Sequence, residues 1–153
     1  MKRIAILSDT HGLLRPEVME RLETVDIILH AGDFDTEPVA EALRRRGDFY
    51  GIRGNNDWWA RSLAKTLTFT IEGIRFFMVH DRRDIPRRLP EVDVVIYGHS
   101  HKYACETRDG ILWLNPGSCG RRRFGGELSF LIMEAQEGRF TLEKVDIEKK
   151  KYT

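Results

Sequence analysis

The sequence predicts an α/β domain in which a parallel half is followed by a largely antiparallel half. In residues 1–57, short apolar runs alternate with segments of helical spacing. That alternation is typical of parallel strands joined by right-handed helical crossovers. In residues 66–147, apolar runs are instead separated by Glu-Gly or Asp-Gly pairs, which are typical of tight hairpins.

The first half should contain three strands and two helices. The strands are expected at 3–7, 25–29 and 49–52, where apolar and β-branched residues cluster. A first helix is expected at 16–23. A second should begin at a Thr36 cap, carry Pro38 in its first turn, and end near Arg46 before Gly47.

The second half should be built mainly from hairpins. We expect strand pairs at 66–71 and 74–79, at 103–107 and 111–114, and at 128–134 and 140–147, with a lone strand at 92–97. Residues 148–151 should form a solvated end.

Composition fits one domain, residues 1–153, since no repeat or linker divides the chain. The 25 basic and 24 acidic residues leave a net charge of +1. A near-neutral chain argues against bulk attraction to nucleic acid or to a membrane. An anionic ligand must therefore be attracted locally, by a metal or by a basic cluster.

The N-terminal apolar run is too short for a signal peptide or a membrane span, so we expect a cytoplasmic protein. Cys105 and Cys119 lack metal-site spacing. They are either buried thiols or, in a hyperthermophile, a disulfide.

Polar side chains follow successive predicted strands at the point where each strand ends. They are Asp9, His11, Asp33, Asn55, His80, His99 and His101. Ligands of α/β sheets bind at these strand ends, and alternate residues in D-x-H and H-x-H converge on one point. Imidazole and carboxylate together suit zinc, manganese, iron, cobalt or nickel. One such motif alone is more often a turn, but the ordered set predicts a metal site.

This ordered set resembles the calcineurin-like metallophosphoesterase superfamily. The shared motifs are Asp9/His11, Gly32-Asp33, Gly54-Asn55-Asn56-Asp57, His80 and Gly98-His99-Ser100-His101. The run Asn115-Pro116-Gly117-Ser118 is similar to the small bacterial and archaeal phosphodiesterase branch. The resemblance implies a four-layer α/β/β/α sandwich of two mostly mixed β-sheets flanked by helices.

The resemblance also implies a division of the ligands between two divalent cations. One cation would be held by Asp9, His11, Asp33 and His101; the other would be held by Asp33, Asn55, His80 and His99. Asp33 would bridge them, and a water shared by both cations would attack phosphorus. Asp9, Asp33, Asn55 and His80 would form the catalytic core. Manganese or nickel is the first expectation, with zinc, iron, cobalt or magnesium as alternatives.

Two positions depart from the family pattern. Asn56 stands where many relatives have histidine, and asparagine cannot act as a general acid near neutral pH. We therefore expect Asn56 to bind substrate and the enzyme to prefer good leaving groups. Arg82 and Arg83 follow His80 where relatives often have Gly-His. Arg82 either contacts substrate phosphate or belongs to a solvated basic loop.

The sequence leaves two alternative roles open for several residues near these motifs. Arg121–Arg123 form either a phosphate clamp or an exposed loop. Trp58 and Trp59 suggest a homo-oligomer interface first and a nucleotide-stacking surface second. Asp57 is expected to accept a hydrogen bond from a ligand histidine, and His30 to be structural.

Three functions remain open. The first is hydrolysis of small or nucleotide-like phosphodiesters. The second is a phosphomonoesterase or phosphoprotein phosphatase on the same metals. The third is a non-catalytic interaction module, like the subunit of this fold in the retromer complex. The full histidine set favours an enzyme.

Overall fold

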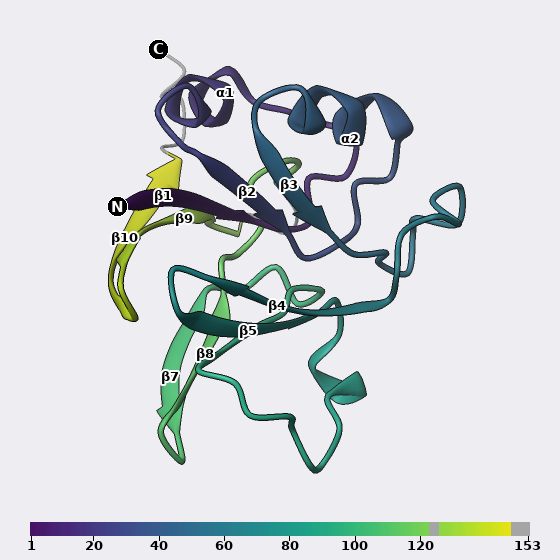
Figure 1. Ribbon diagram of the computed structural model, residues 1–153. Helices are drawn as coiled ribbons and strands as arrows, with labels where there is room; N and C mark the ends of the chain where they lie inside the picture. Colours follow the sequence, from purple (N-terminus) through teal and green to yellow (C-terminus); the bar gives the residue numbers. More distant parts are fainter. Residues whose placement is uncertain (123–125, 148–153) are drawn as a thin grey trace.

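The computed structural model describes residues 1–122 and 126–147, which form two five-stranded sheets packed face to face (Figure 1). Strand order is β10-β9-β1-β2-β3 in the first sheet and β4-β5-β6-β8-β7 in the second. Arg123 and the predicted solvated end at 148–151 lie outside the described residues. The α/β class with two mixed sheets is confirmed.

The first half folds as predicted. Its strands are β1 (Lys2–Leu7), β2 (Ile27–His30) and β3 (Asp48–Gly51). They pair in parallel, and helices α1 (Pro16–Leu22) and α2 (Glu37–Arg44) make the crossovers. Thr36 takes the N-cap position of α2, but its side chain makes no capping hydrogen bond.

The three predicted hairpins are also present. They join β4 (Thr66–Ile71) to β5 (Ile74–Val79), β7 (Ala104–Arg108) to β8 (Ile111–Asn115), and β9 (Leu128–Gln136) to β10 (Arg139–Ile147). Glu72, Asp109 and Glu137 each adopt a positive φ in the turn, and glycine follows each of them. The last hairpin joins the first sheet, where β9 runs antiparallel to β1.

The expectation of a largely antiparallel second half is wrong at the centre of the second sheet. There β6 (Val94–Ile96) pairs in parallel with both β5 and β8. A long connection leads from β5 to β6, and β7 lies between β6 and β8 in the chain, so each connection returns the chain before the next parallel strand. Hairpin signals report only the pairing of neighbouring strands, and they do not show that β8 pairs with β6 as well as with β7.

Apolar layers separate the elements. One cluster, including Ile4, Leu29, Met78 and Leu131, fills the space between the two sheets. A second packs α1 and α2 against the outer face of the first sheet. On the outer face of the second sheet, Ile85 and Leu89 pack over the strands. These two residues belong to a segment whose one helical turn is the 3₁₀ helix η1 (Arg82–Asp84).

Within the described residues, no helix is both long and apolar enough to cross a membrane. Cys105 is exposed and Cys119 is buried, and both thiols are free. The disulfide alternative is therefore not what the structure contains. Burial raises the pKa of the Cys119 thiol to about 12, which keeps this thiol protonated and unreactive.

Candidate metal centre

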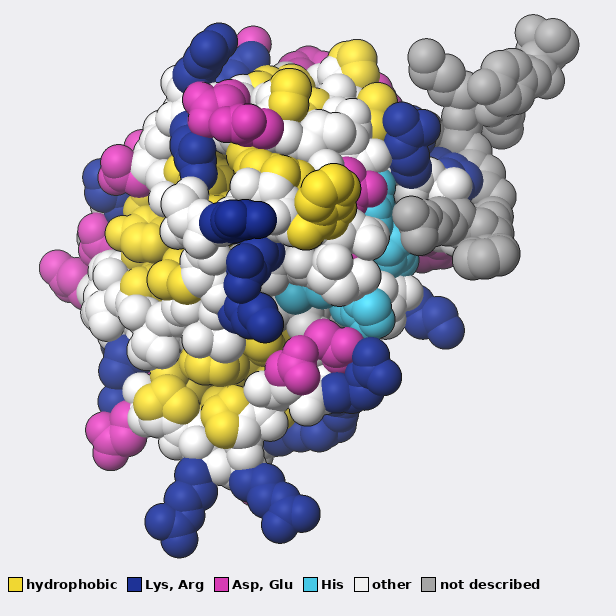
Figure 2. Space-filling view, turned by 90° about the vertical axis from the view of Figure 1, so that its right-hand side faces the viewer, with side chains coloured by type: hydrophobic (Ala, Val, Ile, Leu, Met, Phe, Trp, Pro, Cys, Tyr) yellow, Lys and Arg dark blue, Asp and Glu magenta, His cyan; other side chains and the backbone are white. Residues whose placement is uncertain are grey.

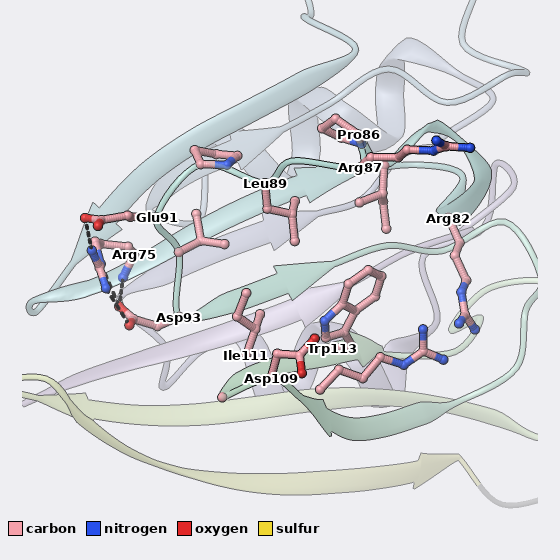
Figure 3. Close-up of a pocket in the computed structure, with 15 residues that line it drawn as sticks. Arg75, Arg82, Pro86, Arg87, Leu89, Glu91, Asp93, Asp109, Ile111 and Trp113 are labelled. Atoms are coloured by element: carbon pink, nitrogen blue, oxygen red, sulfur yellow. Dashed lines mark hydrogen bonds and ion pairs between the residues drawn. The ribbon is translucent and has the colours of Figure 1, made fainter.

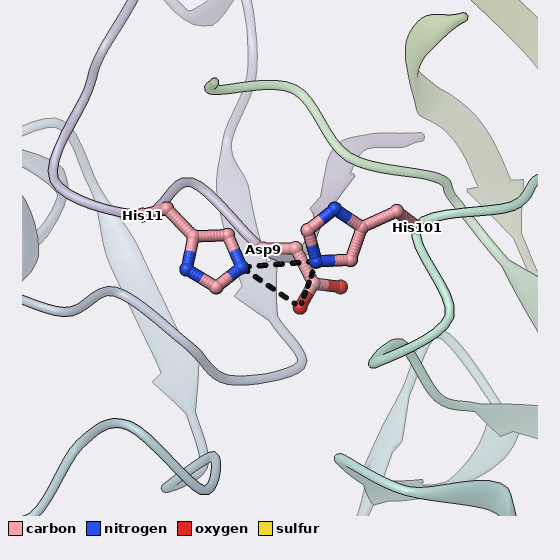
Figure 4. A group of neighbouring side chains, drawn as sticks. All are labelled: Asp9, His11 and His101. Carbon is pink, nitrogen blue, oxygen red and sulfur yellow. Dashed lines mark hydrogen bonds and ion pairs between the residues drawn. The ribbon is translucent and has the colours of Figure 1, made fainter. Parts of the chain in front are cut away.

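The polar side chains that follow the strands meet where the two sheets face each other. Asp9 follows β1, Asp33 follows β2, His80 follows β5 and His99 follows β6. Ligand atoms of Asp9, His11 and His101 lie within 4.8 Å of one another (Figure 4). Those of Asp33, His80 and His99 form a second group with the same spacing. Each group offers enough nitrogen and oxygen donors to hold a divalent cation.

The two groups touch through Asp33 and Asp9. Oδ2 of Asp33 lies 3.2 Å from Nε2 of His80 and 3.8 Å from Nε2 of His11. Oδ1 of Asp9 lies 3.6 Å from Nε2 of His11 and 3.8 Å from Nε2 of His80. A carboxylate oxygen thus lies between the two groups, where a bridging ligand has to be.

Two observations fit metal ions to this cluster. Nε2 of His11 lies 3.0 Å from Nε2 of His101, so two ring nitrogens face each other. Oδ1 of Asp9 and Nε2 of His80 are buried, with no hydrogen-bond partner among the described residues. Leaving such atoms without a partner costs about 1–3 kcal/mol each. Cations between the groups would satisfy all of these donors.

Hydrogen bonds to the other ring nitrogens point the Nε2 atoms inward. Nδ1 of His11 lies 2.9 Å from Oδ2 of Asp35, and Nδ1 of His80 donates to the carbonyl of Ala31 at 2.8 Å. Such partners fix the tautomer of a ligand histidine. On the open side of the cluster, Nδ1 of His99 lies 3.2 Å from Oδ1 of Asn55.

Asp35 was missed from the sequence. In the sequence, Asp35 is the second acidic residue of Gly32-Asp33-Phe34-Asp35, a run that is typical of an ordinary turn. Only the structure shows that His11 lies beside it. The expected histidine partner was Asp57, and this prediction is wrong. Its carboxylate accepts the backbone N–H groups of Asp33, Asp35 and Gly54 instead. Asp57 therefore clamps two loops that carry ligands, without touching a ring.

His30 is structural, as expected. Its ring is fully buried, stacks on Phe34 with centroids 3.7 Å apart, and hydrogen bonds with Thr10 Oγ1 at 3.0 Å. Nδ1 accepts the backbone N–H of Gly32. Burial lowers the pKa of His30 to about 3, so the ring stays neutral near pH 7.

The backbone of the cluster is unusual. Asp9, His11, Asp33, His99 and His101 all have φ between +48° and +71°. Left-handed backbone at non-glycine residues is uncommon and gathers at functional sites. Here it turns the ligands out of the strands and toward one another.

Glycines make room for these ligands. A Cβ on Gly98 would lie 2.7 Å from Oδ2 of Asp9, and one on Gly54 would lie 2.9 Å from Cγ of Asp33. Real side chains do not approach so closely, so the motifs Gly-Asn and Gly-His need glycine for space.

Charges within the cluster compensate one another. Burial alone would lower the pKa of His80, but the nearby Asp33 and Asp9 carboxylates outweigh it and raise the pKa to about 9. Burial alone would raise the pKa of Asp9, but His11, His80 and His101 lower it. Without a cation, protons on histidine balance the carboxylates, and a cation would replace them.

The predicted substrate-binding residues lie in different places. The backbone N–H of Asn56 donates to Oδ1 of Asp33 at 2.9 Å, and its amide lies 3.4 Å from Oδ2. Asn56 is therefore beside the candidate bridging carboxylate. Nε of Arg121 donates to the carbonyl of His11 at 2.9 Å, which brings this guanidinium to the edge of the cluster.

Arg82 lies elsewhere. Its guanidinium lies 5.9 Å from the Trp113 ring centroid and 6.0 Å from that of Tyr97. Figure 3 places it among residues lining a pocket of about 900 Å³ on the outer face of the second sheet. Of the two alternatives for Arg82, contact with substrate phosphate and a place in a basic loop, the structure agrees with the loop. Asp81 lies 3.7 Å from His99, whereas Arg82, in η1, packs on the opposite side.

The two adjacent tryptophan side chains lie in different environments. The side chain of Trp58 is 83% exposed. Trp59 packs edge-on against Phe34, with centroids 6.2 Å apart, in the layer beneath the helices.

Two facing mixed sheets with a histidine–aspartate cluster at their strand ends define the class: an α/β sandwich with a candidate metal centre. The model of the calcineurin-like phosphoesterase superfamily domain matches residues 1–138. The chain therefore belongs to that superfamily.

Its relatives include a probable metallophosphoesterase of Mycoplasma pneumoniae, 33% identical over 132 residues, covering 77% of this chain and 79% of the relative. A phosphodiesterase of Methanocaldococcus jannaschii is 28% identical over 140 residues, covering 76% and 84%. Among solved structures, Chaetomium thermophilum Vps29 superposes with a TM-score of 0.76 at 20% identity, covering 97% of each chain.

Proposed function

We propose that the protein is a dinuclear metal-dependent phosphodiesterase. The observation that carries this proposal is a buried pair of atoms without a hydrogen-bond partner among the described residues, Oδ1 of Asp9 and Nε2 of His80, 3.8 Å apart. Nε2 of His80 also lies 3.2 Å from Oδ2 of Asp33. A buried ring nitrogen that lies close to two carboxylates suits a site for cations. The superfamily and the phosphodiesterase relative supply the reaction class.

In this proposal, Asp9, His11, Asp33 and His101 hold one cation. Asp33, Asn55, His80 and His99 hold the other. When bound, two divalent cations neutralise phosphate oxygens and acidify water. Manganese and nickel are the first candidates, because mixed imidazole and carboxylate ligands suit such metals.

The protein's own groups would position the substrate around these ions. The amide of Asn56 can donate a hydrogen bond to a phosphate oxygen but cannot supply a proton to the leaving group. Arg121, held by the carbonyl of His11, can pair with a second phosphate oxygen. The backbone N–H of His99 donates to Oδ2 of Asp9 at 3.0 Å, which keeps that carboxylate aimed inward.

The test is reconstitution. Metal-stripped protein is reloaded separately with manganese, nickel, zinc or magnesium and assayed with an aryl phosphodiester and an aryl phosphomonoester. We expect diester hydrolysis with manganese or nickel, and its loss in Asp33→Asn. A faster monoester reaction would assign a phosphatase instead.

One observation favours a second candidate, an interaction module. Vps29 structures from several organisms share the fold at 15–23% identity. No hydrolysis with any of the four metals, by protein that still binds them, would favour this candidate.

A further inference from the structure

A pocket of about 400 Å³ adjoins the second ligand group. Asn55 and His80 line it, together with Arg53, Lys65 and Asp81. This volume suits a small organic group. Anything bound there would be continuous with a phosphoester held at the cluster, because Asn55 and His80 belong to both.

Two positively charged side chains, Arg53 and Lys65, line this pocket. Neither of them makes an ion pair in the described part of the chain. Other arginines do pair, for example Arg3 with Glu134 and Arg75 with Asp93. Figure 2 shows Lys and Arg side chains beside the histidines, with acidic side chains just below them.

The acids of the pocket are differently placed. Asp81 accepts hydrogen bonds from Nε and Nη2 of Arg83, the shortest at 2.7 Å. Asp81 is therefore already paired with Arg83, and the other acid of the lining, Asp84, makes no ion pair in the described part of the chain. The unpaired charges of the pocket wall are then two positive ones, Arg53 and Lys65, and one negative one, so the wall keeps an excess of positive charge.

The side chains of Arg53 and Lys65 belong to two backbone segments that are joined by a hydrogen bond. The backbone N–H of Arg53 donates to the carbonyl of Ala64 at 2.8 Å, and Lys65 comes next in the chain. This bond sets the separation of the two side-chain origins before any ligand arrives, which lowers the ordering cost of binding.

We propose that Arg53 and Lys65 bind a second anionic group of the substrate, so that the natural phosphoester carries a further phosphate or carboxylate on its organic part. The inference rests on the proposed function for the placement of the first phosphate. A second anion would gain charge-assisted hydrogen bonds from both side chains, whereas a neutral alcohol would leave them facing solvent.

Calorimetric titration of the manganese-loaded protein tests this without turnover. The ligands are alkanediol monophosphates, alkanediol bisphosphates and ω-phosphoalkanoates with two to five carbons. At one of these chain lengths, we expect the ligand with an anionic group at each end to bind roughly tenfold or more tightly than the monophosphate of the same length. The bisphosphate and carboxylate arms show which second anion is preferred.

Variants locate the effect. Lys65→Gln and the double change Arg53→Gln with Lys65→Gln should remove the advantage and leave monophosphate affinity within about twofold. Arg61→Gln, an exposed arginine outside the pocket, is the matched control and should keep it. Equal affinities for the two ligand classes, or an advantage unchanged in both pocket variants, would overturn the inference. Hydrolysis of a plain aryl diester is unaffected by that outcome, so failure of the proposed function is seen separately.

Discussion

Oδ2 of Asp33 lies 3.2 Å from Nε2 of His80, at the junction of the two ligand groups. In the proposed division, Asp33 is the residue shared by both groups and His80 belongs to only one. Substitutions at these positions should therefore differ in how many cations they remove.

We expect His80→Ala and Asn55→Ala to lose one of two bound cations, His101→Ala to lose the other, and Asp33→Asn to lose both. The reason is the ligand division around the shared carboxylate. Metal content per chain, measured by mass spectrometry after dialysis, checks this. His30→Gln, a buried histidine outside both groups, should retain two. Loss of both cations from any of the three alanine variants, or retention of one cation by Asp33→Asn, would contradict the division.

Asn56→His should raise the rate for alkyl phosphodiesters by about tenfold or more while changing aryl ester rates little. The position lies beside Asp33, and imidazole can donate a proton to a poor leaving group, whereas asparagine cannot. The ratio of kcat for alkyl and aryl substrates is the measurement. If wild type already cleaves both at similar rates, no acid is missing and the expectation fails.

Arg121→Gln should raise KM several-fold with little effect on metal content, because its guanidinium is held at the carbonyl of His11. Arg122 instead donates to the carbonyl of Gly126. Arg122→Gln is therefore the matched control and should leave KM unchanged. Similar KM values in the two variants would assign Arg121 to an exposed loop.

Gly98→Ala should weaken metal binding by at least tenfold, since its Cβ would meet the carboxylate of Asp9. A Cβ on Gly110 meets nothing within 4 Å, although its φ is +78°. Gly110→Ala should therefore lower stability by about 1 kcal/mol through the strained turn and leave metal affinity intact. Calorimetry of metal binding and thermal unfolding separate the two effects.

His30 should make the protein acid-sensitive. The pKa of His30 in the folded protein, about 3, lies below its ordinary value of 6.5. Between these two pH values, His30 is protonated in the unfolded chain but neutral in the native state. This contribution to stability is present above pH 6.5 and is lost as the pH falls toward 3. Relative to His30→Gln, the wild-type advantage in unfolding free energy should shrink by about 1.4 kcal/mol per pH unit in that window. Denaturant titrations at several pH values measure it, and a constant difference would refute it.

Much of the cluster could be predicted because its residues follow apolar strands directly. Asp9, Asp33 and His80 are each placed by the end of a strand, and strands are read from apolar runs. Asp35 and Asp57 were missed or misassigned because their partners lie across loops, where sequence spacing carries no distance. The position of Arg82 could not be predicted, because a single 3₁₀ turn decides which side of the sheet its side chain faces.

The parallel pairing of β6 with β5 and β8 was hidden for a related reason. The connection from β5 to β6 buries Ile85 and Leu89 through tertiary contacts, not through a periodic helix that the sequence would reveal. The connection from β6 to β8 is the strand β7. The hairpins were found because Glu72-Gly73 and Asp109-Gly110 determine their turns locally.

The pairing of β1 with β9 has a consequence for synthesis on the ribosome. Ile4 lies opposite Met133, so the strand leading to Asp9 keeps one open edge until nearly the whole chain has emerged. The first carboxylate made is then among the last to be locked in place. Metal capture during translation should accordingly wait for residues 128–136, and chains released before them should expose an unpaired edge that invites aggregation.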